Sequence, residues 1–168
     1  NLPNATYTVT VRDANGCTGS TTATINVGPL NAVAVLATPV SCNDGADGSI
    51  TVNAGGGVAP YMYSLNGVDF QMGKTFTGLS AGTYTLIVQD DSGNTATTNA
   101  LVLADPAAIT ATAVETLNVI TVTAGGGTGA LTYSLDGQAF QPENIFQNLP
   151  NGAYTITVKD TKGCTATT

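Results

Sequence analysis

The sequence predicts an all-β protein in which one small antiparallel sandwich is repeated along the chain. Three observations carry this prediction. Apolar residues alternate with a period of two, turn-forming pairs such as Asn66-Gly67 separate the alternating runs, and whole motifs return at a fixed distance. Charged residues make up only 9% of the 168 residues, and the abundance of Thr, Ala, Gly and Val suits short strands joined by turns. Long helices are not expected.

Segments of the sequence recur at an offset of 70 residues. The Tyr-Ser-Leu run that begins at Tyr63 returns at Tyr133, with its neighbours in the same order. A partial copy precedes them, because residues 2–21 match residues 79–98 in kind. Fixed-distance repetition of this sort is typical of a linear array of domains.

The repetition predicts three segments. Residues 1–28 would be the C-terminal strands of a preceding repeat, 29–104 a complete sandwich repeat, and 105–168 a second repeat truncated in its last strand. Gly28-Pro29 and Asp105-Pro106 mark the boundaries, since proline removes a backbone donor and fixes φ. The first residues do not resemble a signal peptide, so we expect an internal piece of a longer protein.

The strands of each copy follow from the alternation of apolar residues. About seven short strands in some 70 residues are typical of an immunoglobulin-like sandwich, which we predict for each copy. The residues expected on core faces are Ile50, Val52, Tyr61, Tyr63, Leu65, Tyr84, Leu86 and Val88 in the complete copy, Ile120, Val122, Leu131, Tyr133, Leu135, Tyr154, Ile156 and Val158 in the last, and Tyr7, Val9 and Val11 in the first.

A tyrosine occupies one special position in every copy. Tyr84 and Tyr154 end Leu-x-x-Gly-x-Tyr segments, and Tyr7 follows a similar segment. Immunoglobulin-like sandwiches carry a tyrosine corner at this place, where the hydroxyl bonds to backbone. We therefore predict a structural role for these tyrosines and no binding role.

The composition excludes several classes of function. A net charge of -7, from 11 acidic and 4 basic residues, disfavours binding to nucleic acid or to an anionic membrane. No apolar stretch is long enough to insert into a bilayer. Without His, no Ser-His or Cys-His pair exists, and Gly73-Lys74-Thr75 lacks the earlier glycine of a phosphate-binding loop, since Val68 stands there. We do not expect an enzyme.

Several motifs resemble a known family. Gly-Gly-x-x-x-Tyr-x-Tyr-Ser-Leu begins at Gly56, Leu-x-x-Gly-x-Tyr begins at Leu79 and Leu149, and Val-Ser-Cys-Asn-Asp-Gly spans residues 40–45. This arrangement resembles the SprB-type repeats of very large surface adhesins in gliding and other Bacteroidota. The resemblance implies secretion through a type IX system, an extracellular position on the cell surface, and a role in adhesion or gliding.

The predicted function is mechanical: a stalk or adhesive fibre whose partners are neighbouring repeats or identical chains, with surface glycans or proteins as possible targets. The alternative is a carbohydrate- or protein-binding module that uses the loops 58–61 and 128–131. Those loops differ between the copies and hold one aromatic residue, Tyr61, which weighs against specific recognition.

The sequence contains three cysteines, Cys17, Cys42 and Cys164. In the expected sandwich, Cys42 and the other two lie in loops at opposite ends, so a bridge within one domain would have to span about 17–20 Å, whereas a disulfide allows Cα atoms only about 4.4–6.8 Å apart. Domains stacked end to end would bring Cys42 to Cys164, and we predict that bridge. A Cys17 to Cys42 bridge and free thiols remain as alternatives.

Calcium is the one ligand that the sequence leaves open, and no other cofactor is expected. Asn43, Asp44 and Asp47 cluster in one turn, and closely spaced oxygen ligands suit Ca²⁺. Asp90 and Asp91 are a weaker second possibility. The same residue types are those that turns require, so the pattern favours solvated turn acids over a calcium site.

Overall fold

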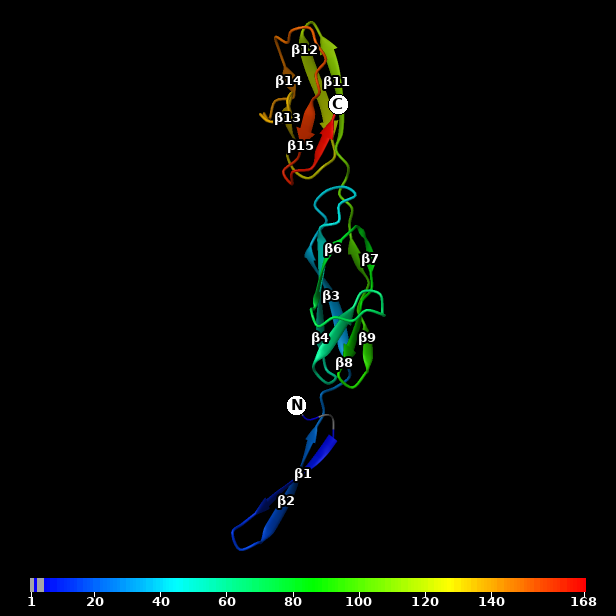
Figure 1. The fold of residues 1–168 in the computed structure, drawn as a ribbon, viewed down its shortest axis with the longest axis vertical. Helices are drawn as coiled ribbons and strands as arrows, with labels where there is room; N and C mark the ends of the chain where they lie inside the picture. The colour runs from blue at the N-terminus through cyan, green and yellow to red at the C-terminus, as the bar shows by residue number, and fades with distance from the viewer. Residues whose placement is uncertain (1, 3–4) are drawn as a thin grey trace. The chain divides into compact units, whose positions relative to one another are not determined.

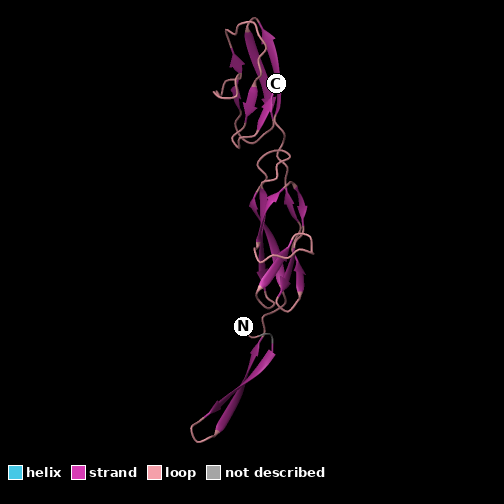
Figure 2. Cartoon of the chain, in the orientation of Figure 1, coloured by secondary structure: helices cyan, strands magenta, loops and turns pink. Residues whose placement is uncertain are grey.

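The computed structural model describes residue 2 and residues 5–168. Every regular element in this part of the chain is a strand, as Figures 1 and 2 show. None of these residues forms a helix with the length and apolar character that a membrane span requires. The strands are β1 (Ala5–Arg12), β2 (Thr18–Ile25), β3 (Asn31–Thr38), β4 (Gly48–Gly55), β5 (Tyr61–Ser64), β6 (Thr75–Leu79), β7 (Gly82–Tyr84), β8 (Ile87–Asp90), β9 (Thr95–Thr97), β10 (Leu101–Leu103), β11 (Thr110–Thr116), β12 (Val119–Gly125), β13 (Thr132–Ser134), β14 (Ile145–Phe146), β15 (Thr157–Lys159) and β16 (Thr165–Thr167).

The sheets repeat along the chain. β3-β4-β6 and β5-β8-β9 are three-stranded sheets, and β11-β12-β14 and β13-β15-β16 repeat them in the same order. β1 pairs with β2, and β10 pairs with β7, in two further sheets. The pairs β1–β2, β5–β8, β8–β9, β11–β12 and β15–β16 are antiparallel. In all of these pairs except β5–β8, a short turn joins the two strands, as the alternating runs predict.

The chain divides into two compact units, and each is described by itself. The first unit contains residues 1–36, 50–76 and 84–101, and the second contains residues 37–49, 77–83 and 102–168. The second unit thus groups segments 37–49 and 77–83 with the C-terminal copy.

One hydrophobic core of the second unit is drawn from both of its three-stranded sheets. Ile120 and Val122 of β12 and Phe146 of β14 cluster with Tyr133 of β13 and with Val158 of β15. The two sheets therefore bury their apolar faces against each other. Fully burying one such aliphatic side chain contributes about 1.5–3 kcal/mol to folding.

The corresponding residues of the first unit are also buried. Ile50, Val52, Leu86 and Val88 have no exposed surface. All four were expected on core faces from the period of two, and the offset of 70 residues maps each onto a member of the second unit's core.

The N-terminal hairpin departs from the expected core pattern. Val9 is 50% exposed and Val11 is 70% exposed, although their counterparts Leu86 and Val88 are fully buried. The reason is that β1 pairs only with β2, so no second sheet covers this face in the described residues. Leu65 also differs, being exposed because β5 ends at Ser64 and Leu65 enters the following turn.

Candidate functional site around the Cys42–Cys164 disulfide

The loop between β3 and β4 carries Cys42 and is braced by its own side chains. Ser41 donates its backbone N–H to Asp47 Oδ1 at 3.0 Å and its hydroxyl to Asp47 Oδ2. The hydroxyl bond, followed by the backbone bond, lowers the pKa of Asp47 below its ordinary value. The Gly45 N–H closes the turn on the Cys42 carbonyl at 2.9 Å. Cys42 is thus presented by an ordered loop.

The same loop is tied to the segment that leads into the last copy. Asn43 donates from Nδ2 to Asp105 Oδ2 at 2.9 Å, and the Asp44 N–H donates to Asp105 Oδ1 at 3.1 Å. Asp105 immediately precedes Pro106, whose ring fixes φ. The carboxylate of Asp105 therefore connects the Cys42 loop to the residue that precedes this proline.

Cys164 lies in a turn that Asp160 organises. Asp160 Oδ1 accepts the N–H groups of Lys162 and Cys164, both at 2.9 Å, and Oδ2 accepts the N–H of Thr128 at 2.7 Å. Burial of this carboxylate opposes its ionisation, but the bonds from Thr128, Cys164 and Lys162 outweigh burial and lower its pKa. An ionised Asp160 is therefore part of the folded turn.

The same turn occurs in all three copies. Asp13 and Asp90 accept from the N–H four residues later at 2.8 Å, as Asp160 does from Cys164. The fourth residue after the aspartate is Cys17 in the first copy and Asn94 in the second. The turn geometry is therefore constant, while the side chain that it presents changes.

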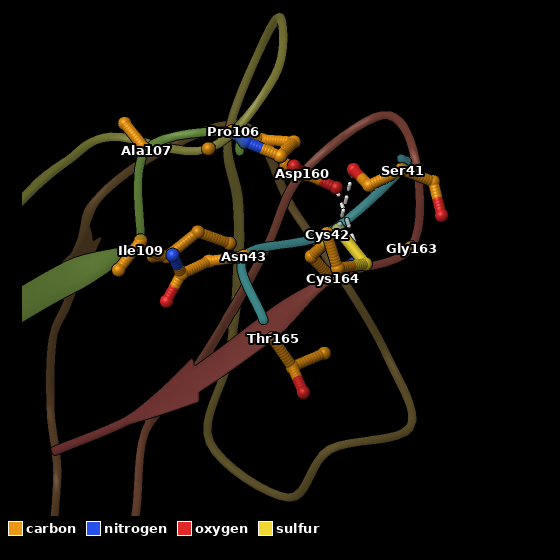
Figure 3. Close-up of a pocket in the computed structure, with 12 residues that line it drawn as sticks. Ser41, Cys42, Asn43, Pro106, Ala107, Ile109, Asp160, Gly163, Cys164 and Thr165 are labelled. Atoms are coloured by element: carbon orange, nitrogen blue, oxygen red, sulfur yellow. Dashed lines mark hydrogen bonds between the residues drawn. A yellow bond between two sulfur atoms is a disulfide. The ribbon is translucent and has the colours of Figure 1, made fainter. Parts of the chain in front are cut away.

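The structure joins Cys42 and Cys164, the pair that the sequence favours, in a disulfide with Cα atoms 5.6 Å apart and a sequence separation of 122. Figure 3 shows this bond beside Asp160 and the Ser41 backbone. Cys164 Sγ lies 3.3 Å from the Ser41 carbonyl oxygen, a contact without a proton because a disulfide sulfur carries none. The β3–β4 loop and the β15–β16 turn, both in the second unit, are thus covalently linked.

A shallow cavity of about 390 Å³ lies beside the disulfide. Its wall includes Pro106, Ile109, Gly127 and Asp160 as well as the two cysteines. The Gly127 N–H donates to the Ala107 carbonyl at 3.0 Å. The segment after Pro106 is thus hydrogen-bonded to the glycine triplet 125–127.

Comparison with known proteins identifies part of the chain. Residues 34–70 match the family model of the SprB repeat, and this stretch includes the Cys42 loop and strands β4 and β5. This match supports a SprB-type repeat at these residues. SprB repeats occur in cell-surface proteins, which suggests a repeat module of a surface protein of the gliding or adhesin type. No curated protein matches the chain.

The residues named as calcium candidates take part in hydrogen bonds within the protein. Asp47 accepts from Ser41, while Asn43 and the Asp44 backbone donate to Asp105. Asp90 is occupied by Val58 and Asn94. In the described residues, no three His, Cys, Asp or Glu side chains are grouped as metal ligands. Calcium binding remains a prediction without a geometric argument in its favour.

The tyrosines predicted at the corner are all partly buried. Tyr154 donates its hydroxyl to the Pro150 carbonyl at 2.8 Å, four residues upstream, which is the bond a tyrosine corner requires. Tyr7 lies in β1 and Tyr84 ends β7. The tyrosine-corner role of Tyr7, Tyr84 and Tyr154 stays a prediction.

The remaining cysteine stands apart from the bridge. Cys17 is a free, exposed thiol between β1 and β2. It occupies the turn position that Cys164 occupies in the last copy. The competing Cys17 to Cys42 bridge does not occur in the structure, because Cys42 is bonded to Cys164.

The glycine triplets pack against backbone and do not form a phosphate-binding loop before a helix. Gly126 has φ +77°, and a Cβ there would lie 1.9 Å from the Ala108 carbonyl oxygen. Only glycine fits at this position, since both the backbone angle and the space exclude a side chain.

Sequence reasoning placed Asp105 at a boundary but missed its hydrogen bonds to the Cys42 loop, and it did not recognise what Asp13, Asp90 and Asp160 do. The signal for the latter was present, because an Asp followed three residues later by Gly stands at equivalent places in all copies. Asp and Gly in that order indicate a side-chain-closed turn. Asp105 gave no such signal, since its partners lie about 60 residues earlier.

Proposed function

We propose that the chain is a load-bearing segment of a secreted surface protein, a stalk or fibre that serves gliding or attachment. The observation that carries this proposal is the disulfide that joins a loop of one sequence copy to a turn of the next, 122 residues away. A crosslink at that place limits how far the chain extends under tension.

Tandem immunoglobulin-like sandwiches are the proposed architecture. Support comes from the repeated pair of three-stranded sheets and from a core that both sheets share in the last copy. In such an array each repeat contacts only its neighbours, so neighbouring repeats, or identical chains in a fibre, are the proposed partners.

The disulfide supports the proposed extracellular location, because such bonds persist in oxidising compartments. Its mechanical effect follows from connectivity. Tension applied outside residues 42 and 164 passes through the covalent bond, whereas the hydrogen-bonded strands between them carry less of it. The segment from β4 to β15 is therefore the part that we propose to be shielded.

A role without catalysis or cofactor is proposed because the polar groups of the site already have structural partners. Asp47, Asp105 and Asp160 each accept two or more hydrogen bonds from the protein itself. In the alternative binding module, the aromatic of the candidate loop would contact ligand. The Tyr61 hydroxyl instead donates to the Gly56 carbonyl at 2.6 Å, which favours the stalk.

Two measurements test this function. On intact cells that produce the protein, external protease is expected to remove the repeat, and protection until lysis would overturn surface display. The second measurement applies the 168-residue chain and its Tyr61→Ala variant to glycan and surface-protein arrays. Saturable binding that depends on Tyr61 is not expected. A saturable signal that the substitution abolishes would favour the binding module over the stalk.

A further inference from the structure

In the last copy a lysine covers an aromatic ring on the outer face of a sheet. Lys159 of β15 places Nζ 3.7 Å from the centroid of the Phe140 ring. Val158 before it is fully buried, and because the side chains of a strand alternate between its two faces, Lys159 points away from the core. The ring attracts the ammonium because the π electrons make its face negative. The last copy therefore supplies its own cation to its own ring.

The complete copy has the same ring but not the lysine. The offset of 70 residues places Phe70 where the last copy has Phe140, and Gln89 where it has Lys159. Among the described residues, Lys159 over Phe140 is the one contact of a cation with an aromatic ring. A neutral amide thus stands in the complete copy at the position of the ammonium, and no cation of the described chain covers Phe70.

The backbone holds the two rings in equivalent places. Tyr63 and Gln71 exchange two backbone hydrogen bonds, of 2.8 and 2.9 Å, directly after Phe70. Tyr133 and Gln141 exchange the same two bonds with the same lengths. The ladders β5–β8 and β13–β15 also keep the same register at the offset of 70 residues. The difference between the two faces therefore lies in their side chains.

Two exposed apolar side chains stand next to Phe70 in its loop. Val68 is 78% exposed and Met72 is 73% exposed, two residues before and two residues after the ring. The last copy has Gln138 and Pro142 at these positions and keeps the same bridge between the loop and its strand. The fold therefore does not require a valine and a methionine there, and their exposure in the complete copy indicates a contact surface.

We infer that the Phe70 face of the complete copy is a docking site for a lysine side chain of a separate protein. The ammonium lies over the ring, as that of Lys159 lies over Phe140, and the aliphatic stem contacts Val68 and Met72. Charge favours such a partner, because the chain carries 11 acidic and 4 basic residues. The site uses no residue of the disulfide region, so the inference does not depend on the proposed mechanical function.

A titration with a short lysine peptide tests the site. The probe is acetyl-Ala-Lys-Ala-amide, and NMR of the 168-residue chain with labelled phenylalanine rings gives the readout. The ring signals of Phe70 are expected to shift in a saturable manner, whereas those of Phe140, already covered by Lys159, are expected to stay in place. A peptide with norleucine in place of lysine keeps the stem and lacks the ammonium, so it is expected to bind about two- to fivefold more weakly.

An exchange of side chains between the copies provides matched variants. Gln89→Lys gives the complete copy the lysine of the last copy and is expected to lower the apparent affinity at Phe70 about two- to fivefold. Lys159→Gln removes that lysine from the last copy, so the peptide is then expected to shift Phe140 as well. Thr85→Lys adds the same charge at another exposed position and is expected to leave the Phe70 response unchanged.

Three outcomes of these titrations would overturn the inference. They are an absence of saturable shifts at Phe70, equal binding of the lysine and norleucine peptides, and a Phe70 response of full strength in Gln89→Lys. Choline chloride is the remaining probe. If it shifts Phe70 at a lower concentration than the lysine peptide does, the ring binds a quaternary ammonium and the lysine assignment is wrong.

Discussion

Asn94 donates a hydrogen bond from its side-chain amide to Asp90 Oδ2 at 3.0 Å, at the turn position where the last copy places Cys164. This bond is the largest cause of the lowered pKa of Asp90. The aspartate turn is therefore complete without a cysteine. Where the cysteine is present, the turn holds it in position for a disulfide bond.

Loss of the Asn94 amide is expected to move the pKa of Asp90 upward. In Asn94→Ala the carboxylate keeps its backbone donors but loses its side-chain donor. NMR titration of the Asp90 side chain measures the change. Ser92→Ala is the control, since Ser92 contributes only its backbone N–H, and equal pKa values in the two variants would contradict the assignment.

Acid is expected to destabilise the fold. The pKa values of Asp47, Asp90, Asp136 and Asp160 are all lowered, so the folded state binds fewer protons than the unfolded chain. Their contribution is present above the unfolded pKa of about 3.9 and is lost as pH falls through the lower folded values. With no His in the sequence, stability is expected to be flat between about pH 6 and 8. Thermal unfolding across pH checks both statements, and a fold that gains stability on acidification would refute them.

Removing the crosslink is expected to lower the free energy of unfolding of the second unit by about 2–4 kcal/mol, because the unfolded chain regains the freedom of a long loop. The double variant Cys42→Ser with Cys164→Ser, followed by denaturant unfolding, provides the measurement. Cys17→Ser is the matched control, as its thiol is exposed and unbonded. Identical midpoints for the double variant and the control would show that the bond stabilises nothing.

One thiol in the native, oxidised chain is expected to react with maleimide. Cys17 is exposed, whereas Cys42 and Cys164 are bonded. Mass spectrometry of the labelled chain should therefore place a single adduct on Cys17, and reduction should raise the number to three. Label on Cys42 or Cys164 before reduction would mean that the pairing is different.

A methyl group at Gly126 is expected to cost more stability than one at Gly93. Both glycines have positive φ, so each alanine substitution is expected to lower the free energy of unfolding by about 1 kcal/mol through the backbone angle alone. Only at Gly126 does the added carbon collide with backbone, at the Ala108 carbonyl, which raises the expected loss to about 2 kcal/mol or more. Circular dichroism melts of Gly126→Ala and Gly93→Ala give the comparison, and equal losses would argue against the close approach.

The sequence was sufficient to predict the all-β class and most of the core, because strand alternation is a local pattern that burial enforces. Ile50, Val88, Val122 and Val158 are buried where the period of two places them. Val9 shows the limit of that reasoning. Its pattern is the same as that of Leu86, but in the described residues β1 pairs only with β2 and no second sheet covers Val9.

The site was predictable where topology restricts a covalent bond and unpredictable where it depends on single hydrogen bonds. Cys42 and Cys164 were paired because an expected sandwich leaves few partners within reach. The bond from Asn43 to Asp105 and the contact of Gly126 with Ala108 arise only when loops distant in sequence meet. The sequence predicts solvated or metal-binding roles for the acidic turn residues for the same reason, because it does not show which backbone N–H groups approach their carboxylates in the folded chain.

Single-molecule pulling of the 168-residue chain from its two ends tests the load-bearing role most directly. In the oxidised chain, the 122-residue span between Cys42 and Cys164 is expected to stay locked. Reductant is then expected to add about 400 Å of extension, from about 3.3–3.6 Å per residue. Equal extension with and without reductant would contradict the claim that this bond carries tension between the copies.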